Sequence, residues 1–172
     1  MKKKETILAL SLIVIAITFR LIPHIPNFVP ITAIAIFSGR YFNRLWAYLL
    51  PIGAMLATDY FLGFSDVTFY VYLSLILAAL VGFYLQSHFS WKNLAFGTLL
   101  SSIIFFIVTN FGVWEAGWYG HTLPGLILCY EMAIPFFRNS LLGDIFYTGL
   151  IFGIYEIIKA RLLSRNKPIV TA

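Results

Sequence analysis

A series of apolar runs, each close to the length of a membrane-crossing helix, dominates this sequence. The first, at 6–22, has no charged residue before Arg20. An α-helix needs about 20 mostly apolar residues to cross the hydrocarbon core of a bilayer, which is roughly 30 Å thick. Apolar and aromatic residues make up 60% of the 172 residues, and charged residues only 11%. A water-soluble core cannot bury so much apolar surface in a chain of this length. We therefore expect an all-α integral membrane protein that forms a single transmembrane domain over 1–172.

Six of these runs are expected to form transmembrane helices, one of them short. Their approximate limits are 6–22, 31–42, 45–64, 67–86, 94–109 and 141–158. Pro23, Pro26 and Pro30 separate the first two runs, because proline ends a helix and fits the first position of the next. The run at 31–42 is short for a span. It is either a thin or tilted span or a helix that leans on protein instead of lipid.

Another apolar stretch, at about 123–137, is also short for a span and contains Pro124 and Pro135. A re-entrant or interfacial helix is expected there, separate from the last span.

Basic residues cluster on one side of this layout. Ten fall on that side: Lys2, Lys3, Lys4, Arg40, Arg44, Lys92, Lys159, Arg161, Arg165 and Lys167. Only Arg20 and Arg138 fall on the other. Cytoplasmic loops carry the excess of Lys and Arg, so both termini are predicted to be cytoplasmic in a multi-pass protein of the bacterial inner membrane. Basic residues at the ends of apolar runs are topology signals, so no nucleic-acid partner is expected despite the net charge of +5.

Most acidic residues map to the opposite, outer half: Asp59, Asp66, Glu115, Glu131 and Asp144. A charge inside a membrane span costs roughly 2.5–3.5 kcal/mol on insertion scales, so such residues face the bundle interior and usually mark a ligand site or pathway. For Asp59, the alternative is an interfacial cap or a partner for Arg20. For Asp144, it is a cap in the first turn of the last span, favoured by the helix dipole.

Two further groups of residues have both a structural and a ligand-binding interpretation. Glu131 and Arg138 are seven residues apart and share a helix face unless Pro135 breaks it, so an ion pair is favoured over a ligand contact. An aromatic cluster forms either a membrane-interface belt or a wall against a planar ligand. Its members are Phe111, Trp114, Trp118, Tyr119 and Tyr130.

Small residues recur at four-residue spacing in three runs: Ala35 and Gly39, Gly53 and Ala57, and Gly149 and Gly153. This spacing lets helices pack closely in lipid. Packing within the chain is the favoured interpretation, and docking on a partner is the alternative.

Catalytic and metal-binding patterns are weak. The three histidines are not spaced as metal ligands on a helix, and no glycine-rich phosphate-binding loop occurs. We expect no enzyme activity, no metal and no cofactor, and an energy source outside the chain for any active transport.

Several motifs resemble those of an uncharacterised bacterial family of membrane proteins assigned to transport. They are Pro26-Asn27-Phe28-Val29-Pro30, Thr58-Asp59-Tyr60-Phe61-Leu62-Gly63, Thr109-Asn110-Phe111-Gly112-Val113-Trp114, Pro135-Phe136-Phe137-Arg138-Asn139 and Gly143-Asp144. That family in turn is similar to the S components, the substrate-binding subunits of energy-coupling factor transporters.

The resemblance implies an S-component-like bundle that binds a vitamin-like molecule near the extracellular face, under the loop after the first helix. It implies substrate contacts from Asn27, Asp59, Asn110, Trp114, Tyr130, Asn139 and Asp144. It also implies a transmembrane coupling subunit with ATPases. S components commonly carry Ala-x-x-x-Ala on helix one for that docking, whereas Ala9 and Ala16 here are seven residues apart, which leaves this partner open.

The function expected from the sequence is therefore a membrane-embedded substrate-binding subunit for uptake of a small organic nutrient. A stand-alone gradient-driven transporter or channel is the alternative. An intramembrane enzyme or assembly scaffold is the third hypothesis.

Overall fold

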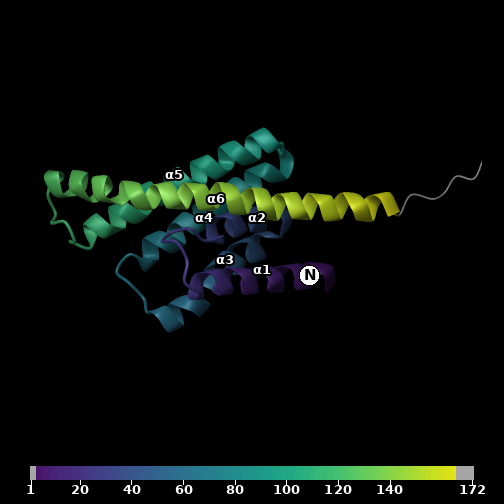
Figure 1. The fold of residues 1–172 in the computed structure, drawn as a ribbon, viewed down its shortest axis with the longest axis horizontal. Coiled ribbons are helices and arrows are strands. Elements are labelled where there is room, and N and C mark those ends of the chain that lie inside the picture. Colours follow the sequence, from purple (N-terminus) through teal and green to yellow (C-terminus); the bar gives the residue numbers. More distant parts are fainter. Residues whose placement is uncertain (1–2, 166–172) are drawn as a thin grey trace, which may run out of the picture.

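The computed structural model describes residues 3–165, with side chains over 7–161 (Figure 1). Its helices are α1 (Lys3–Leu21), α2 (Ile31–Tyr41), α3 (Arg44–Leu62), α4 (Thr68–Ser87), α5 (Trp91–Glu115) and α6 (Leu123–Arg165). Within these residues there is no strand, which confirms the all-α prediction.

Four helices, α3 to α6, are long and apolar enough to cross a membrane, and Ile7–Leu21 of α1 is a shorter apolar helix. Large apolar side chains such as Ile107 and Ile134 are exposed on their outer faces. Water does not favour such a surface, but lipid does. The chain is therefore a multi-pass membrane protein in contact with the bilayer.

Helix α2 lies inside the bundle. All residues from Ile31 to Gly39 are buried, and α3, α4 and α6 pack around the helix. Its 11 residues span only about 16 Å, so α2 does not cross the bilayer by itself. Of the two interpretations of 31–42, the one observed is a helix that packs against protein instead of lipid.

Two glycines allow α2 and α4 to touch. A Cβ atom on Gly39 would overlap the carbonyl oxygen of Ala79, and one on Gly82 would overlap the carbonyl oxygen of Ile36. The Ala35 and Gly39 pair thus serves packing within the chain. Added Cβ atoms at Gly53, Gly149 and Gly153 would meet nothing within 4 Å, so these other small residues make no such approach to the described atoms.

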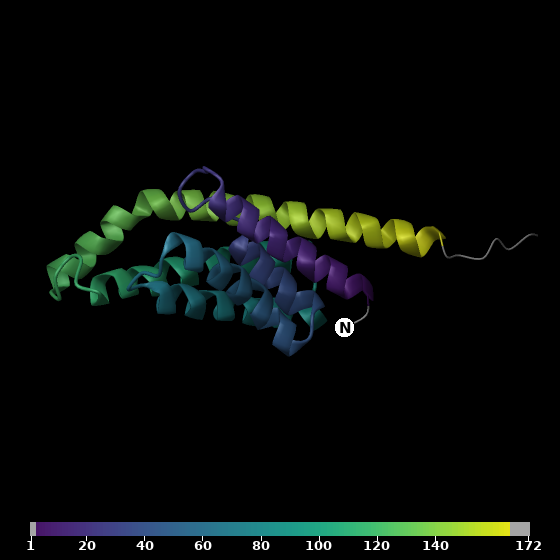
Figure 2. The ribbon, with the colours of Figure 1, turned by 90° about the horizontal axis from the view of Figure 1, so that it is seen from below.

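The predicted break between 123–137 and 141–158 is wrong, because both stretches belong to the single helix α6. Arg138, Asn139 and Ser140 are all helical, and α5 packs along the helix. Pro135 removes one backbone hydrogen bond, which a helix tolerates by bending. Figure 2 shows α6 curving along its green N-terminal part. With 43 residues, or about 64 Å, α6 is roughly twice as long as the hydrocarbon core is thick.

Helix α5 is also longer than its predicted limits of 94–109. It begins at Trp91, where the Ser90 side chain caps the helix by accepting a hydrogen bond from the Asn93 amide at 3.0 Å, and it continues to Glu115. The hairpin of α5 and α6 consequently projects beyond α1 and α3 at one end of the bundle (Figures 1 and 2).

We call this end, which holds the loops 22–30, 63–67 and 116–122, the pocket end. The opposite end, which we call the basic end, holds Arg40, Arg44, Lys92, Lys159 and Arg161 at or near helix termini. This grouping is the one on which the predicted cytoplasmic orientation depends.

Candidate functional site

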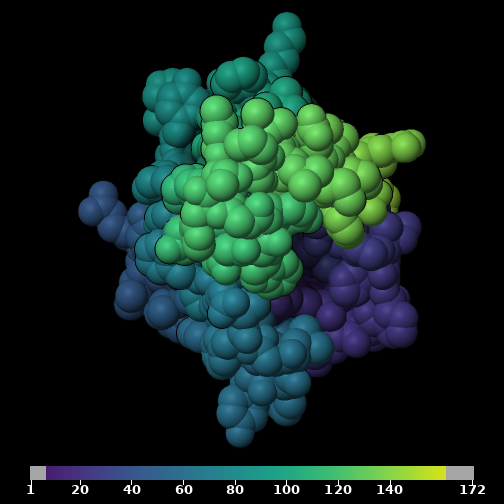
Figure 3. Space-filling model, turned by 90° about the vertical axis from the view of Figure 1, so that its left-hand side faces the viewer, coloured from purple at the N-terminus to yellow at the C-terminus, as the bar shows by residue number. Residues whose placement is uncertain are grey.

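A cavity of about 330 Å³ opens at the pocket end. It lies between the loop 22–30, the start of α4, the second half of α5, the 116–122 turn and the first half of α6. Figure 3 views the molecule from this end and shows a hollow between the green part of α6 and the purple N-terminal region. The lining residues are Asn27, Val67, Val71, Phe105, Phe106, Thr109, Asn110, Val113, Trp118, Tyr119, Cys129, Met132, Ala133, Phe136, Phe137 and Ser140.

Aromatic and aliphatic side chains make up most of this wall. The aromatic members come from α5, the 116–122 turn and α6: Phe105, Phe106, Trp118, Tyr119, Phe136 and Phe137. No charged side chain of the described residues lines the cavity. The site therefore offers stacking surfaces and hydrogen bonds instead of countercharges.

Three amide or hydroxyl side chains from the loop 22–30, α5 and α6 are available to a ligand. The Asn110 Nδ2 donates to the Phe106 carbonyl at 2.7 Å, and its Oδ1 has no partner among the described atoms. Asn27 is exposed, adopts a left-handed conformation with φ of 63°, and has no side-chain hydrogen bond in the described structure. The hydroxyl of the half-buried Ser140 also has no hydrogen bond among the described residues. By contrast, Thr109 donates its hydroxyl proton to the Phe105 carbonyl at 2.7 Å. Asn27, Asn110 and Ser140 thus offer polar contacts to a bound molecule, as do the Tyr119 hydroxyl and the Trp118 Nε1 of the 116–122 turn.

Trp114 and Tyr130 hold the hairpin together and do not line this cavity. The Trp114 Nε1 donates to the Thr122 carbonyl at 3.2 Å, and the Tyr130 hydroxyl donates to the Ile107 carbonyl at 2.7 Å. Tyr130 instead borders a second, open depression with Phe106 and Ile134, which is almost entirely apolar. In this conformation the polar atoms of both side chains are hydrogen-bonded to backbone carbonyls.

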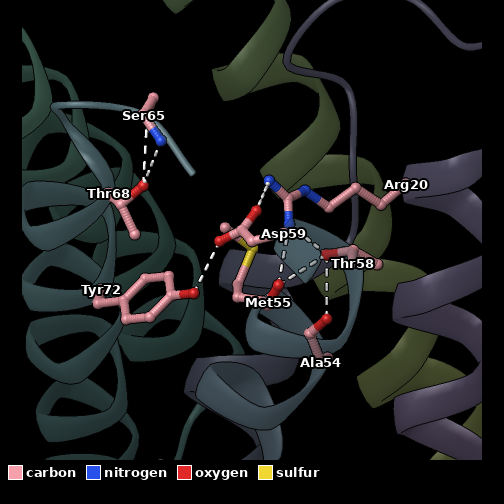
Figure 4. Close-up of polar contacts among 8 residues, drawn as sticks. All are labelled: Arg20, Ala54, Met55, Thr58, Asp59, Ser65, Thr68 and Tyr72. Carbon is pink, nitrogen blue, oxygen red and sulfur yellow. Dashed lines mark hydrogen bonds and ion pairs between the residues drawn. The ribbon is translucent and has the colours of Figure 1, made fainter. Parts of the chain in front are cut away.

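Asp59 belongs to an ion-paired network between three helices (Figure 4). Its Oδ1 lies 2.6 Å from Arg20 Nη2 of α1, and its Oδ2 accepts a hydrogen bond from the Tyr72 hydroxyl of α4 at 2.7 Å. Arg20 also donates to the Thr58 hydroxyl and to the Met55 carbonyl. Asp59 is only 4% exposed and does not line the cavity. Of its alternatives, the partner for Arg20 is the one found.

Asp144 is buried as deeply, at 3% exposure, but its partners are hydroxyls. The Ser102 Oγ of α5 lies 2.7 Å from its Oδ2, and the Thr32 side chain of α2 is a second hydrogen-bond partner. Asp144 is near the middle of α6, so the prediction of a cap in a first helical turn is wrong. It also lies outside the cavity lining.

The remaining predicted residues lie apart from the cavity. Asn139 is half-buried in α6 and is not in the lining. Glu131 and Arg138 are both exposed and form no ion pair with each other, and Pro135 lies between them in α6.

The cavity thus unites two of the seven predicted contacts, Asn27 and Asn110, with aromatic residues that the sequence pattern singles out only in part. Trp118 and Tyr119 belong to the aromatic cluster for which a ligand wall was one interpretation. Phe105 and Phe106 lie inside an apolar run, where composition does not distinguish a cavity wall from a lipid-facing surface.

Comparison with known proteins places this architecture in one family. The model of a family of unknown function, DUF6580, matches residues 1–167. No curated protein and no solved structure matches the chain.

Proposed function

The chain belongs to the DUF6580 family of unknown function, and we propose that it is a membrane-embedded binding protein that captures a small, uncharged organic nutrient for uptake. The observation that supports this proposal is the cavity at the pocket end, with its aromatic wall and the available polar side chains of Asn27, Asn110 and Ser140. Its volume of about 330 Å³ falls at the lower end of the range for small-molecule sites, roughly 300–1,000 Å³.

The lining favours a flat molecule. Aromatic pairs stack with about 0.5–1.5 kcal/mol beyond the burial of their area, and the cavity has such surfaces on three segments of the chain. Asn110 and Asn27 would orient the molecule, because the free Oδ1 of Asn110 accepts a hydrogen bond and an amide group both donates and accepts.

The acidic residues argue against a charged cargo. Asp59 and Asp144, which were expected beside the ligand, are engaged by protein groups away from the cavity. A charged molecule that entered this cavity would lose its hydration without gaining a countercharge, and that desolvation costs free energy. A neutral, planar, vitamin-sized compound is the cargo that this lining suits.

Ligand carry-over tests the proposal. The full chain, purified into lipid nanodiscs from cells grown in rich medium, is expected to release one small molecule that mass spectrometry detects in stoichiometric amount. Asn110→Leu should reduce this molecule at least tenfold, because the change removes a polar contact of the site. Asn139→Leu is the matched control, since Asn139 also lies on a membrane helix but outside the lining. Equal recovery from both variants, or none from the wild type, would refute capture in this cavity.

Asp144 favours a second candidate, a stand-alone transporter driven by a gradient, because this buried carboxyl has no basic partner among the side chains that the structure describes. Proteoliposomes that hold only this protein distinguish the two. Accumulation of the released molecule without ATP supports the gradient-driven transporter. Accumulation only after a coupling subunit and its ATPases are added supports the S-component-like subunit.

A further inference from the structure

We propose that Asp144 is a proton-binding site at the centre of the bundle and that it carries its proton in the conformation described here. This inference rests on the contacts of Asp144 alone and does not depend on the nature of the cargo. Ser102 is near the middle of α5 and Asp144 near the middle of α6, so the pair lies far from both ends of the membrane-crossing segments.

The two buried aspartates differ in their partners. Asp59 has an arginine at 2.6 Å, whereas hydroxyls of α2 and α5 are the hydrogen-bond partners of Asp144. The basic residues of those helices are remote: Arg40 binds the Gln86 carbonyl at the basic end, and Lys92 is in the first turn of α5. An uncompensated charge at this depth costs about 2.5–3.5 kcal/mol even on insertion scales, and protonation removes that cost.

Hydrogen-bond geometry gives independent support. The Ser102 Oγ lies 2.7 Å from Asp144 Oδ2 and 3.0 Å from the carbonyl oxygen of Thr98. A hydroxyl has one proton to donate, and a backbone carbonyl can only accept. If Asp144 is ionised, Ser102 must divide that proton between two acceptors. If Asp144 is protonated, it donates to Ser102, Ser102 donates to Thr98, and both contacts become full hydrogen bonds.

The same region contains spare hydroxyls. The Oγ of Ser101 and the Oγ1 of Thr148 are buried and have no hydrogen-bond partner within the described part of the chain. Ser101 is next to Ser102, and Thr148 follows Asp144 by one helical turn on the same face. Such groups provide donors and acceptors for a proton that leaves or reaches Asp144.

The cavity supplies the route to solvent. Ser140 lines the cavity and lies one helical turn before Asp144 on the same face of α6. The loop 22–30 covers α6 beside Asp144. Its Phe28 backbone comes so near Gly143 that an added Cβ atom there would be 3.2 Å from Phe28 Cα, and the Phe28 ring lies against Phe146 and Tyr147. Tyr147 is the other titratable side chain of α6 near Asp144, and its ring meets Phe19 edge-on and Phe28 at a tilt. Movement of the loop would let water exchange the proton of Asp144 through the cavity.

Infrared spectroscopy of the full chain in lipid tests the proposal. At neutral pH we expect the carbonyl stretch of a protonated carboxylic acid, shifted by D2O and by isotope-labelled aspartate. Asp144→Asn, which imitates the neutral acid in size and hydrogen bonding, should remove this band. Asp66→Asn is the control and should retain it, because Asp66 is exposed. Ser102→Ala should move the band to higher wavenumber, since the acid loses the acceptor of its proton.

Three results would overturn the proposal. The first is a wild-type protein in which the band is absent or does not shift with isotope-labelled aspartate. This result is decisive even if Asp144→Asn does not fold. The second is a band that survives Asp144→Asn. The third is a band that appears only when sodium is replaced by a large organic cation, because the occupant of the carboxylate would then be a metal ion instead of a proton.

Discussion

Arg20 and Asp59 form a 2.6 Å ion pair that ties the last turn of α1 to the last turn of α3. Helix α1 packs mainly on α3 and makes few contacts with α2, so this pair is a principal polar link between the N-terminal helix and the bundle. Tyr72 extends the link to α4.

Arg20→Gln should destabilise the protein, because it leaves the Asp59 carboxylate buried with only the Tyr72 hydroxyl. Breaking a buried pair costs about 3–5 kcal/mol, and partial exposure of Arg20 reduces our expectation to about 1–3 kcal/mol. Thermal unfolding in detergent measures the loss. Arg138→Gln is the control, since Arg138 is exposed and should change stability by less than about 0.5 kcal/mol. Equal stability of the two variants would show that the pair contributes nothing.

Gly39→Ala should also destabilise the fold, since even one methyl group would overlap the backbone of α4. Overpacking of this kind typically costs about 1–3 kcal/mol. Gly149→Ala lies in α6 with no atom within 4 Å of the added carbon, so it should be neutral or slightly stabilising. Unfolding midpoints of the two variants provide the measurement, and a neutral Gly39→Ala would contradict the close crossing of α2 and α4.

Asn27→Gly separates the two roles of this loop residue. Glycine adopts the positive φ of 63° without strain, so the stability of the variant should equal or exceed that of the wild type. The amide is lost, however, and we expect at least a fivefold decrease in recovery of the carried-over molecule. Asn27→Ala should lose both recovery and about 1 kcal/mol of stability. Full recovery by Asn27→Gly would remove Asn27 from the binding site.

Trp118 should report binding by its fluorescence. It lines the cavity while being 63% exposed, so a bound molecule would exclude water from its ring. Adding the released molecule to protein stripped of it should shift the emission to shorter wavelength. Trp118→Phe should abolish most of this change, and Trp91→Phe at the basic end should preserve it. A change that persists in Trp118→Phe would place the ligand elsewhere.

Much of the helical layout could be predicted, because each run of apolar residues is a local property of the chain. The limits of α3 and α4 agree with the predicted spans to within one or two residues. The continuous α6 was missed because proline and polar residues interrupt its apolar pattern. Their effect on a helix depends on the packing of α5 beside them, which the local sequence does not contain.

The sequence by itself determined that this chain is a lipid-embedded helical bundle, because its apolar content leaves the bilayer as the suitable solvent. It also determined that costly polar side chains would turn inward. Only the tertiary structure decided what those side chains meet. Asp59 pairs with a cation, Asp144 is hydrogen-bonded to hydroxyls, and neither lines the cavity, although the same role was expected of both from the sequence. The physical reason is that a buried charge is stabilised by its neighbours in space. Those neighbours are far away in the sequence: Tyr72 is 13 positions from Asp59, and Ser102 is 42 positions from Asp144.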